Sequence, residues 1–331
     1  MAPPILVLDE REIRACVVVD AKALAAVEHA FTGLARGEAV VPEPMGIEVP
    51  ERSADIHVKA AYLRGWPGFA VKVASGFYAN VELPSSSGMM ILFSAETGWP
   101  MALLLDNGYL TEVRTALAGA IAARHLAPAR PRTIGVVGTG SQARYQVEAL
   151  RLVRVFERVL VWGRRAEAAS RCCAELTERF GVAALPAEKV GDLVRDSDLV
   201  ITATAAREPL VKAADLHPGL HITAMGSDGP SKQELEAAAL ARADLLVCDR
   251  KAQCLRLGEL QHLAAAGLQD AAARVLELGE LTSGAKPGRA DDRQISICDL
   301  TGVGVQDTAI ACLAYAEARQ RRLGTEFGRP A

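Results

Sequence analysis

A glycine-rich turn in the middle of the chain contains the first residues with a clear chemical use. The segment TIGVVGTGSQARYQ follows an apolar run and begins a helix-forming one, and it carries the spacing Gly138-x-Gly140-x-x-Ala143. The first glycine permits a tight turn, the second lets the backbone approach a pyrophosphate, and a small third residue allows close helix packing. The helix amino terminus then faces the phosphates. We therefore predict a dinucleotide-binding turn made by Gly138, Thr139, Gly140, Ser141, Gln142 and Ala143.

The strand that follows, RVLVWG, indicates which dinucleotide this turn would bind. Enzymes that use NAD usually carry an acidic residue at the end of this strand for the ribose 2′-hydroxyl. Here Gly163 is followed by Arg164 and Arg165, and guanidinium groups suit a 2′-phosphate. We therefore favour NADP(H), with NAD(H) as the alternative if the arginines are only solvated surface. The predicted cofactor site is completed at the ends of later strands by Thr202, Thr204, Met225 and Gly226.

Three charged residues in other segments have the types needed to bind and protonate a small acid. Lys72 lies in the run AVKVAS, where strand alternation places it on the opposite face from its valine neighbours. Arg114 lies in the first turns of a predicted helix, from which a guanidinium can clamp a carboxylate. Asp228 follows the strand LHITAMG at its carboxyl end, where ligands bind in open α/β sheets. The alternatives are an exposed lysine, a surface salt bridge and a turn residue.

The first part of the chain must position Lys72 and Arg114. A capping box at Asp9 and Glu12 and a helical repeat from Asp20 to Gly37 predict that the chain opens with helices. The period then changes to two at 56–62, which indicates strands. A meander is expected to continue through the runs GFAVKVAS, GMMILFSA and MALLLD, each bounded by turn residues.

The second part of the chain has the alternating strand and helix pattern of a nucleotide-binding domain. After an Ala-rich helix at 111–126, short apolar strands alternate with helix-length polar segments, which predicts a parallel, doubly wound sheet. A closing helix after Asp307 is expected to return to the first domain. The predicted fold class is α/β, with a Rossmann-type, doubly wound parallel sheet in this second part. The expected strands are TIGVVG, RVLVWG, DLVITAT, LHITAMG, DLLVCD and QISICD.

Composition excludes several classes of protein. The 331 residues are 50% hydrophobic and carry a net charge of -3 from well-mixed charges, which argues against nucleic-acid and membrane partners. No apolar run reaches the roughly 18 residues of a membrane span. Seven cysteines without paired spacing indicate a reducing, cytoplasmic location. No cluster of His, Cys and acidic residues has the spacing of a metal site.

Several blocks, in order along the chain, resemble the ornithine cyclodeaminase/mu-crystallin family. The resemblance implies a homodimer, with a mixed α+β substrate-binding and dimerisation domain at 1–128 plus 306–331. The Rossmann-type, NAD(P)-binding domain at 129–305 is inserted in it. It also implies that Lys72 contacts the substrate carboxylate and assists proton transfer, that Arg114 holds the same carboxylate, and that Asp228 is the acid/base. The blocks are VKVASGFYAN, SAETGWPMALLLDNGYLTEVRTALAGAIAARHLA, VVGTGSQA, AMGSDGPSKQEL and TGVGVQDTAIA.

Two residues depart from the ornithine-cyclising members of the family. His57 stands where those enzymes carry an acid for the distal ammonium, and Lys59 replaces an apolar neighbour. A cationic wall repels a diamine and accepts an acidic or polar end, unless Lys59 lines the dimer interface. The sequence is similar to iminosuccinate reductases and to reductase-like proteins of ectoine-utilisation operons. We expect NAD(P)H-dependent reduction of the imine of a small 2-oxo acid. The alternatives are an oxidative amino-acid dehydrogenase, a cyclodeaminase and a non-catalytic NADPH-binding protein.

Overall fold

The computed structural model describes residues 3–328, and the chain forms two compact units. Unit 1 runs to Arg114 and resumes at Val303, and unit 2 is Thr115–Gly302. The predicted domain boundaries are 128/129 and 305/306, whereas these units divide at 114/115 and 302/303.

The first boundary falls inside helix α3 (Tyr109–Leu126) because the second half of that helix is bonded to unit 2. The Gln146 side chain donates to the carbonyl of Thr115 at 3.1 Å. The Arg154 guanidinium donates to the carbonyls of Ala123 and Arg124 at 2.8 and 2.9 Å. The helix therefore belongs to both units, and Arg114 is the last residue assigned to the first.

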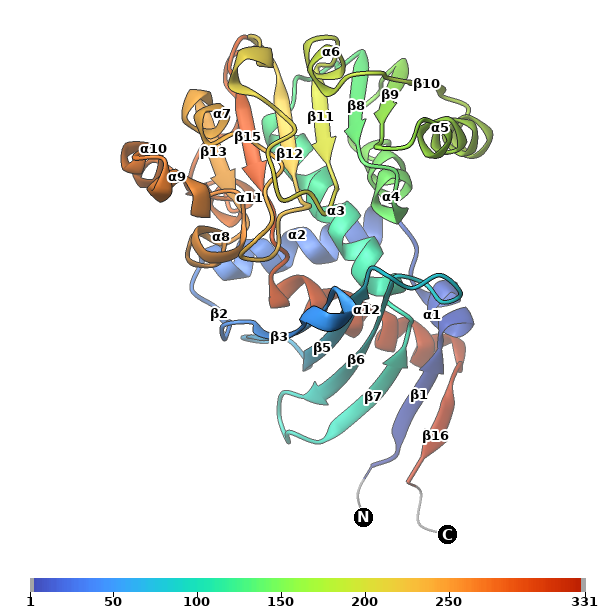
Figure 1. Ribbon diagram of the computed structural model, residues 1–331. Helices are drawn as coiled ribbons and strands as arrows, with labels where there is room; N and C mark the ends of the chain where they lie inside the picture. The colour runs from blue at the N-terminus through green and yellow to red at the C-terminus, as the bar shows by residue number, and fades with distance from the viewer. Residues whose placement is uncertain (1–2, 329–331) are drawn as a thin grey trace. The chain divides into compact units, whose positions relative to one another are not determined.

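Unit 1 is a mixed sheet with helices on one face. Its strands run in the order β16-β1-β7-β6-β5-β4-β2, and β3 pairs with the outer part of β4. Helix α12 packs on β4, β5 and β6 and against α2, and Figure 1 shows it along that face of the sheet. The elements are β1 (Ile5–Asp9), α1 (Glu10–Cys16), α2 (Ala21–Ala35), β2 (Ala39–Val40), β3 (Met45–Val49), a 3-10 turn (Pro50–Arg52), β4 (Ala54–Leu63), β5 (Gly68–Phe77), β6 (Ser86–Ser94), β7 (Pro100–Leu105), α12 (Gly304–Arg321) and β16 (Thr325–Phe327).

The expectation that the chain opens with helices is wrong by one element. Strand β1 comes first, pairing parallel with β7 and antiparallel with β16. The apolar run Ile5–Asp9 is short, and its partners lie far along the chain, so a local pattern does not reveal it. The capping box at Asp9 is confirmed: its side chain accepts from the Glu12 amide at 2.8 Å, and the Glu12 side chain accepts from the Asp9 amide.

Unit 2 is a parallel sheet flanked by helices, as the alternating pattern predicted. The strand order is β10-β9-β8-β11-β12-β15-β13-β14. Strands β9 and β10 are added on one side of β8, and β11 and the later strands on the other side. The point between β8 and β11 is therefore a topological switch point, where dinucleotides bind. The elements are β8 (Thr133–Val137), α4 (Ser141–Leu150), β9 (Arg158–Trp162), α5 (Ala166–Phe180), β10 (Ala183–Pro186), α6 (Val190–Arg195), β11 (Leu199–Thr202), a 3-10 turn (Ala213–Asp215), β12 (His221–Ala224), α7 (Ala237–Arg242), β13 (Leu245–Cys248), α8 (Lys251–Leu257), α9 (Gln261–Ala265), α10 (Gln269–Ala273), β14 (Leu276–Glu277), α11 (Leu278–Thr282) and β15 (Ser296–Asp299).

The central strands β8, β11, β12 and β15 are buried along their whole length. This explains their continuous apolar character, since both faces of a doubly wound sheet are covered by helices. Within residues 3–328, no helix is both long and apolar enough to cross a bilayer. The seven cysteines, all inside the described range, are buried thiols.

Candidate active site

The side chain of Lys72 points to the helix-covered face of the unit 1 sheet. It is 2% exposed, and its strand neighbours Val71 and Val73 face the other side and are only half-buried. The alternation was predicted correctly, but it is the lysine and not the valines that lies inside. The exposed-lysine alternative is therefore wrong. A buried ammonium needs an anionic partner, so the site must contain one.

Lys59 lies directly opposite Lys72 on the neighbouring strand β4. Its side chain is 6% exposed, and cross-strand partners have Cβ atoms about 5 Å apart on the same face of a sheet. Two like charges in this arrangement repel unless carboxylates lie close to them. The pair therefore marks a place where negative charge is favoured.

One of these carboxylates belongs to Asp307 in the first turn of α12. Its Oδ1 lies 2.9 Å from Nε of Arg114, its Oδ2 lies 3.5 Å from Nζ of Lys72, and the side chain is completely buried. Arg114 is 5% exposed, and its Nη1 also donates to the Gln306 side chain at 3.4 Å. The alternative of a surface salt bridge is therefore wrong. Asp307 lies in the matched block TGVGVQDTAIA, but sequence analysis had no basis for assigning it a role because its two partners are far away in the chain.

A second buried carboxyl, Asp106, lies at the start of α3. Its Oδ2 accepts from the Leu110 amide at 2.7 Å, whereas its Oδ1 is buried without a hydrogen-bond partner. Burial raises the pKa of Asp106 to about 6, and the negative charge of Asp307 acts in the same direction. The carboxyl group is thus easier to protonate in the folded chain than in the unfolded chain.

We expect Asp106 to make the stability of the protein depend on pH. Because its pKa is raised on folding, its contribution is complete below about pH 4 and is lost as the pH rises to about 6, by up to about 3 kcal/mol. Replacing Asp106 by Asn keeps an acceptor for Leu110 and removes the titration. Denaturant melts between pH 4 and 8 should show a smaller fall in stability for the variant; an equal fall would contradict the assignment.

His57 lies two residues before Lys59 on β4, and therefore on the same face of the strand. Its Nε2 is 3.6 Å from Asp55 Oδ1, and the Tyr78 hydroxyl donates to Asp55 Oδ2 at 3.2 Å. An acid thus lies beside His57, at a position that sequence analysis did not consider. His57 and Lys59 remain predictions as substrate-binding residues.

In unit 2, the turn after β8 has the shape expected of a pyrophosphate site. Gly138 has a φ of 129°, and a Cβ there would lie 2.5 Å from the carbonyl oxygen of Ala203, so no other residue fits. A Cβ on Gly140 would meet nothing within 4 Å, so the backbone is open just before helix α4. Ala143, in the first turn of that helix, is fully buried. This turn fits a dinucleotide.

Arg164 and Arg165 follow β9 and are both exposed. Gly163 before them approaches the Gly138 turn so closely that a Cβ would lie 2.6 Å from the Thr139 side chain. The two arginines therefore begin next to the turn, at the carboxyl edge of the sheet. Their exposure leaves them accessible to a ligand phosphate.

A buried glutamate, Glu234, joins the ends of β11 and β12. It is 0% exposed, and its carboxylate accepts from the Thr202 hydroxyl, the Thr204 amide and hydroxyl, and the Gly226 amide, at 2.6 to 2.8 Å. Burial raises the pKa of Glu234, whereas these donors act in the opposite direction. The predicted cofactor residue Thr202 is itself fully buried, so its hydroxyl holds Glu234. Sequence analysis missed Glu234, which lies inside the matched block AMGSDGPSKQEL.

Asp228 lies two residues after Gly226 in the loop that follows β12. Its Oδ1 is 2.6 Å from Nζ of Lys232, and its side chain is about one-third exposed. The Ser227 hydroxyl donates to the Lys232 carbonyl at 2.9 Å, and the His262 ring is 2.9 Å from the same oxygen. These contacts hold the loop in one conformation. The Asp228 carboxylate is accessible at the carboxyl end of the sheet.

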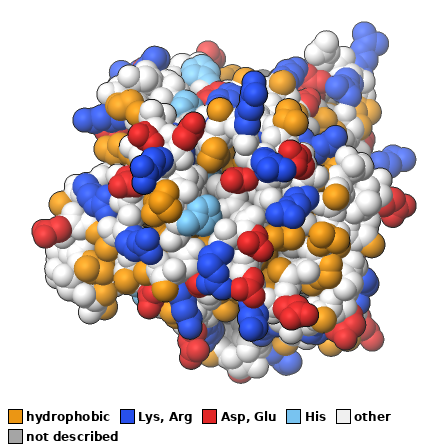
Figure 2. Space-filling model, turned by 90° about the horizontal axis from the view of Figure 1, so that it is seen from above, with side chains coloured by type: hydrophobic (Ala, Val, Ile, Leu, Met, Phe, Trp, Pro, Cys, Tyr) orange, Lys and Arg blue, Asp and Glu red, His pale blue; other side chains and the backbone are white. Residues whose placement is uncertain are grey.

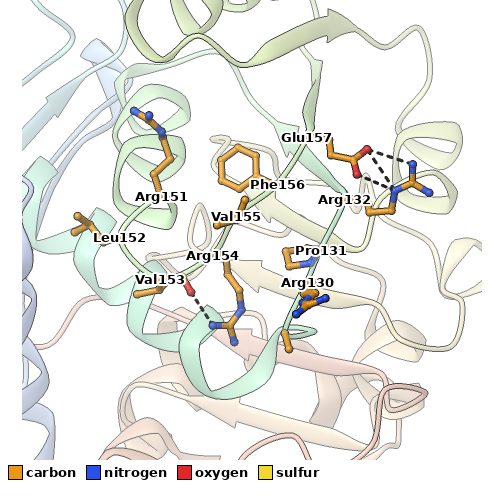
Figure 3. A pocket seen from close by; sticks show the side chains of 11 residues that line it. Arg130, Pro131, Arg132, Arg151, Leu152, Val153, Arg154, Val155, Phe156 and Glu157 are labelled. Carbon is orange, nitrogen blue, oxygen red and sulfur yellow. Dashed lines mark hydrogen bonds and ion pairs between the residues drawn. The ribbon is translucent and has the colours of Figure 1, made fainter.

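A hollow of about 590 Å³ lies at the opposite edge of the same sheet. Figure 3 shows Arg132 paired with Glu157 and Arg154 turned away towards the backbone. Arg154 donates to Pro128, Ala123 and Arg124 carbonyls and so secures the end of α3. The hollow lies at the amino ends of β8 and β9, and this separates it from the glycine turn. It is lined by Ala129, Arg130, Pro131, Arg132, Arg151, Leu152, Val153, Arg154, Val155, Phe156 and Glu157.

The surface in Figure 2 carries acidic and basic side chains interspersed with apolar ones, so this face offers no field of a single sign. Among the described residues, no group of three or more His, Cys, Asp and Glu side chains is arranged to hold a metal ion.

The chain is similar to several known proteins over nearly its whole length. A Rhizobium meliloti protein named as a putative dehydrogenase is 45% identical over 97% of this chain and 98% of its own length. The iminosuccinate reductase of Paracoccus denitrificans is 34% identical over 97% and 99%. The structure of Thermococcus litoralis Δ1-pyrroline-2-carboxylate reductase with NADH and L-proline superposes with a TM-score of 0.92 and 31% identity, covering 97% and 99%. The family model matches residues 5–322, and the chain belongs to the ornithine cyclodeaminase/mu-crystallin family.

Proposed function

We propose that this protein is an NAD(P)H-dependent reductase of the imine of a small 2-oxo acid. The observation that carries the proposal is the buried charge of unit 1. Three cations, Lys59, Lys72 and Arg114, share the interior with two carboxyls, Asp106 and Asp307, and the pKa of Asp106 is raised to about 6. Buried cations on one face of the sheet attract a carboxylate strongly, and a substrate carboxylate is the anion that we propose they bind.

The reaction follows from the residues that would hold the two reactants. Arg114 and Lys72 fix the carboxylate and so orient the adjacent imine carbon, which is catalysis by positioning. A reduced nicotinamide bound in unit 2 would supply the hydride that turns the C=N bond into CH–NH. In this scheme Asp228 gives the imine nitrogen its proton before that transfer, and its carboxylate then stabilises the resulting iminium charge. Asp307 does not touch the substrate in this scheme; it holds the two cations.

The cofactor residues are those of the Gly138 turn and the β9 end. The pyrophosphate would lie against the backbone at Gly140 and the amino end of α4. Arg164 and Arg165, exposed and without a neighbouring acid in the position used for NAD, support NADP(H) over NAD(H). Replacing both by Ala is the variant that tests this preference.

Oxidation of NADPH, then NADH, against a panel of imines tests the function. The panel contains oxaloacetate with ammonia, pyruvate with methylamine, a cyclic ketimine, and L-ornithine with ammonia detection. We expect fast oxidation with at least one imine and higher kcat/KM with NADPH, which the double Ala variant should lose by about tenfold. Ammonia release from ornithine as the only activity would make the protein a cyclodeaminase instead.

Lys59 supports a finer proposal, that the substrate carries a second carboxylate or another acidic or polar end. The cation lies beside Lys72 on the same buried face, so an acidic side chain on the substrate gains an ion pair that an alkyl chain does not. Replacing Lys59 by Met is the variant that tests it. Preference for the oxaloacetate imine over the pyruvate imine should then fall by about tenfold or more.

We also propose that the protein is a homodimer, formed by the other face of the unit 1 sheet. That face carries apolar side chains that no helix of unit 1 covers, and a second copy offers the matching surface. Sedimentation should give twice the mass of the 35.1 kDa chain, and a monomer would contradict the proposal. The exposed apolar residues of these strands include Val40, Met45, Ile47, Tyr62, Met89, Leu105 and Phe327.

A further inference from the structure

We propose that Glu234 is the positioning residue for Asp228, and that its carboxylate sets the distance of the Asp228 loop from the end of β11. The proposal rests on the function proposed above. Glu234 does not reach solvent, so it acts through the backbone that it binds and not on the substrate.

The two oxygens of Glu234 hold the two loops separately. Oε1 accepts from the amide and hydroxyl of Thr204, at the end of β11, at 2.6 and 2.7 Å. Oε2 accepts from the Gly226 amide at 2.8 Å, only two residues before Asp228, and from the Thr202 hydroxyl at 2.6 Å. Both loops lie at the carboxyl edge of the sheet, where open α/β sheets bind their ligands.

The approach of the loops is very close. A Cβ on Gly226 would lie 2.2 Å from the Thr204 carbonyl and 2.5 Å from Cδ of Glu234, so the chain at this point has no spare room. Glu234 is itself fixed, because its amide and that of Leu235 donate to the buried Glu259 carboxyl group at 2.7 and 3.1 Å. A rigid acceptor pair therefore determines where the Asp228 loop begins.

A carboxylate is required here, and its amide analogue cannot replace it. The amides of Thr204 and Gly226 can only donate, and they donate to different oxygens of Glu234. Glutamine has one oxygen and one NH₂ group, so one backbone amide must face a donor and move away. Displacement of a catalytic group by about 1 Å can cost about 100-fold in rate.

The test is a double-mutant cycle with the substrate found in the imine panel. We expect Glu234→Gln to lower kcat by about 10- to 100-fold and to leave NADPH affinity within about threefold. In the Asp228→Asn background the same change should lower kcat by less than about twofold, because the group that Glu234 positions is already lost. The isotope effect of C4-deuterated NADPH should rise in E234Q, since a misplaced proton-handling group slows the chemical step.

Glu236→Gln is the matched control, two residues further on. Its carboxylate accepts one bond, from the Ala213 amide at 2.8 Å, and an amide oxygen can accept that bond equally well. Its kcat should equal that of the unmodified enzyme. If E234Q does not fold, Thr202→Val removes one donor from the same carboxylate, and the same cycle with D228N is run with it.

The outcomes separate this inference from the function it rests on. Full kcat in E234Q, or an equal loss of kcat with and without the D228N change, would overturn the positioning role and leave the reductase intact. If the unmodified chain reduces no imine, the proposed function fails first, before any variant is compared.

Discussion

Replacing Lys72 with methionine is expected to lower kcat by about 1000-fold. The lysine is 2% exposed, 3.5 Å from Asp307 and beside Lys59, so it belongs to the interior that is proposed to hold the substrate carboxylate. If Lys72 both positions the carboxylate and assists proton transfer, as proposed, its loss removes two contributions, of which proton transfer alone is worth about 10²- to 10⁴-fold. Methionine is unbranched like lysine and one atom shorter, so it keeps most of the apolar part of the side chain without the charge.

Steady-state rates with the best imine, together with NADPH affinity from fluorescence titration, measure this effect. NADPH affinity should stay within about threefold, because the residues proposed to bind the cofactor are all in unit 2. Lys212→Met is the control, since Lys212 is an exposed lysine and its loss should leave kcat unchanged. A K72M enzyme that retains its kcat would remove Lys72 from the catalytic residues.

The sequence predicts the nucleotide-binding unit well because the relevant signals are local. The strand pattern, the Gly138 turn and the arginines after β9 all lie within about 30 residues, the size of one βαβ unit. Their geometry depends on neighbours within that unit, as the close approach of Gly163 to the Thr139 side chain illustrates. The family resemblance added Lys72, Arg114 and Asp228 as predicted substrate-site residues.

The residues that sequence analysis missed act over long separations. Asp307 meets Lys72 and Arg114 only because α12 returns to the unit 1 sheet, and the chain between them includes all of unit 2. Period-two alternation places Lys72 opposite Val71 and Val73, but it cannot say which face a helix covers. Strand β1 was not predicted for the same reason, since both strands that it pairs with lie far away in the sequence.

Glu234 was missed for a different reason. Its type and position suggest an exposed acid in a loop, and only the fold shows that Thr202, Thr204 and Gly226 direct four donors at it. Buried polar groups of this kind keep their bonds because an unsatisfied one costs about 1 to 3 kcal/mol. Sequence patterns that record only apolar period cannot find them.

Replacing Asp307 with asparagine is expected to destabilise unit 1 by about 3 to 5 kcal/mol. The carboxylate is fully buried between Arg114, at 2.9 Å, and Lys72, at 3.5 Å, and its removal leaves two buried cations without that anion. Calorimetry should show a fall in Tm on the order of 10 °C. Glu10→Gln, which breaks the exposed pair with Arg14, is the control and should cost less than about 1 kcal/mol.

The double variant D307N/K72M distinguishes a loss of stability caused by uncompensated charge from one caused by disturbed packing. If the loss comes from uncompensated positive charge, removing one cation restores part of the stability, and the double variant is more stable than D307N alone. If the loss comes only from disturbed packing around α12, the two changes add and the double variant is less stable than either. A substrate carboxylate or a mimic such as acetate should also stabilise D307N more than the unmodified chain, because it supplies the missing negative charge.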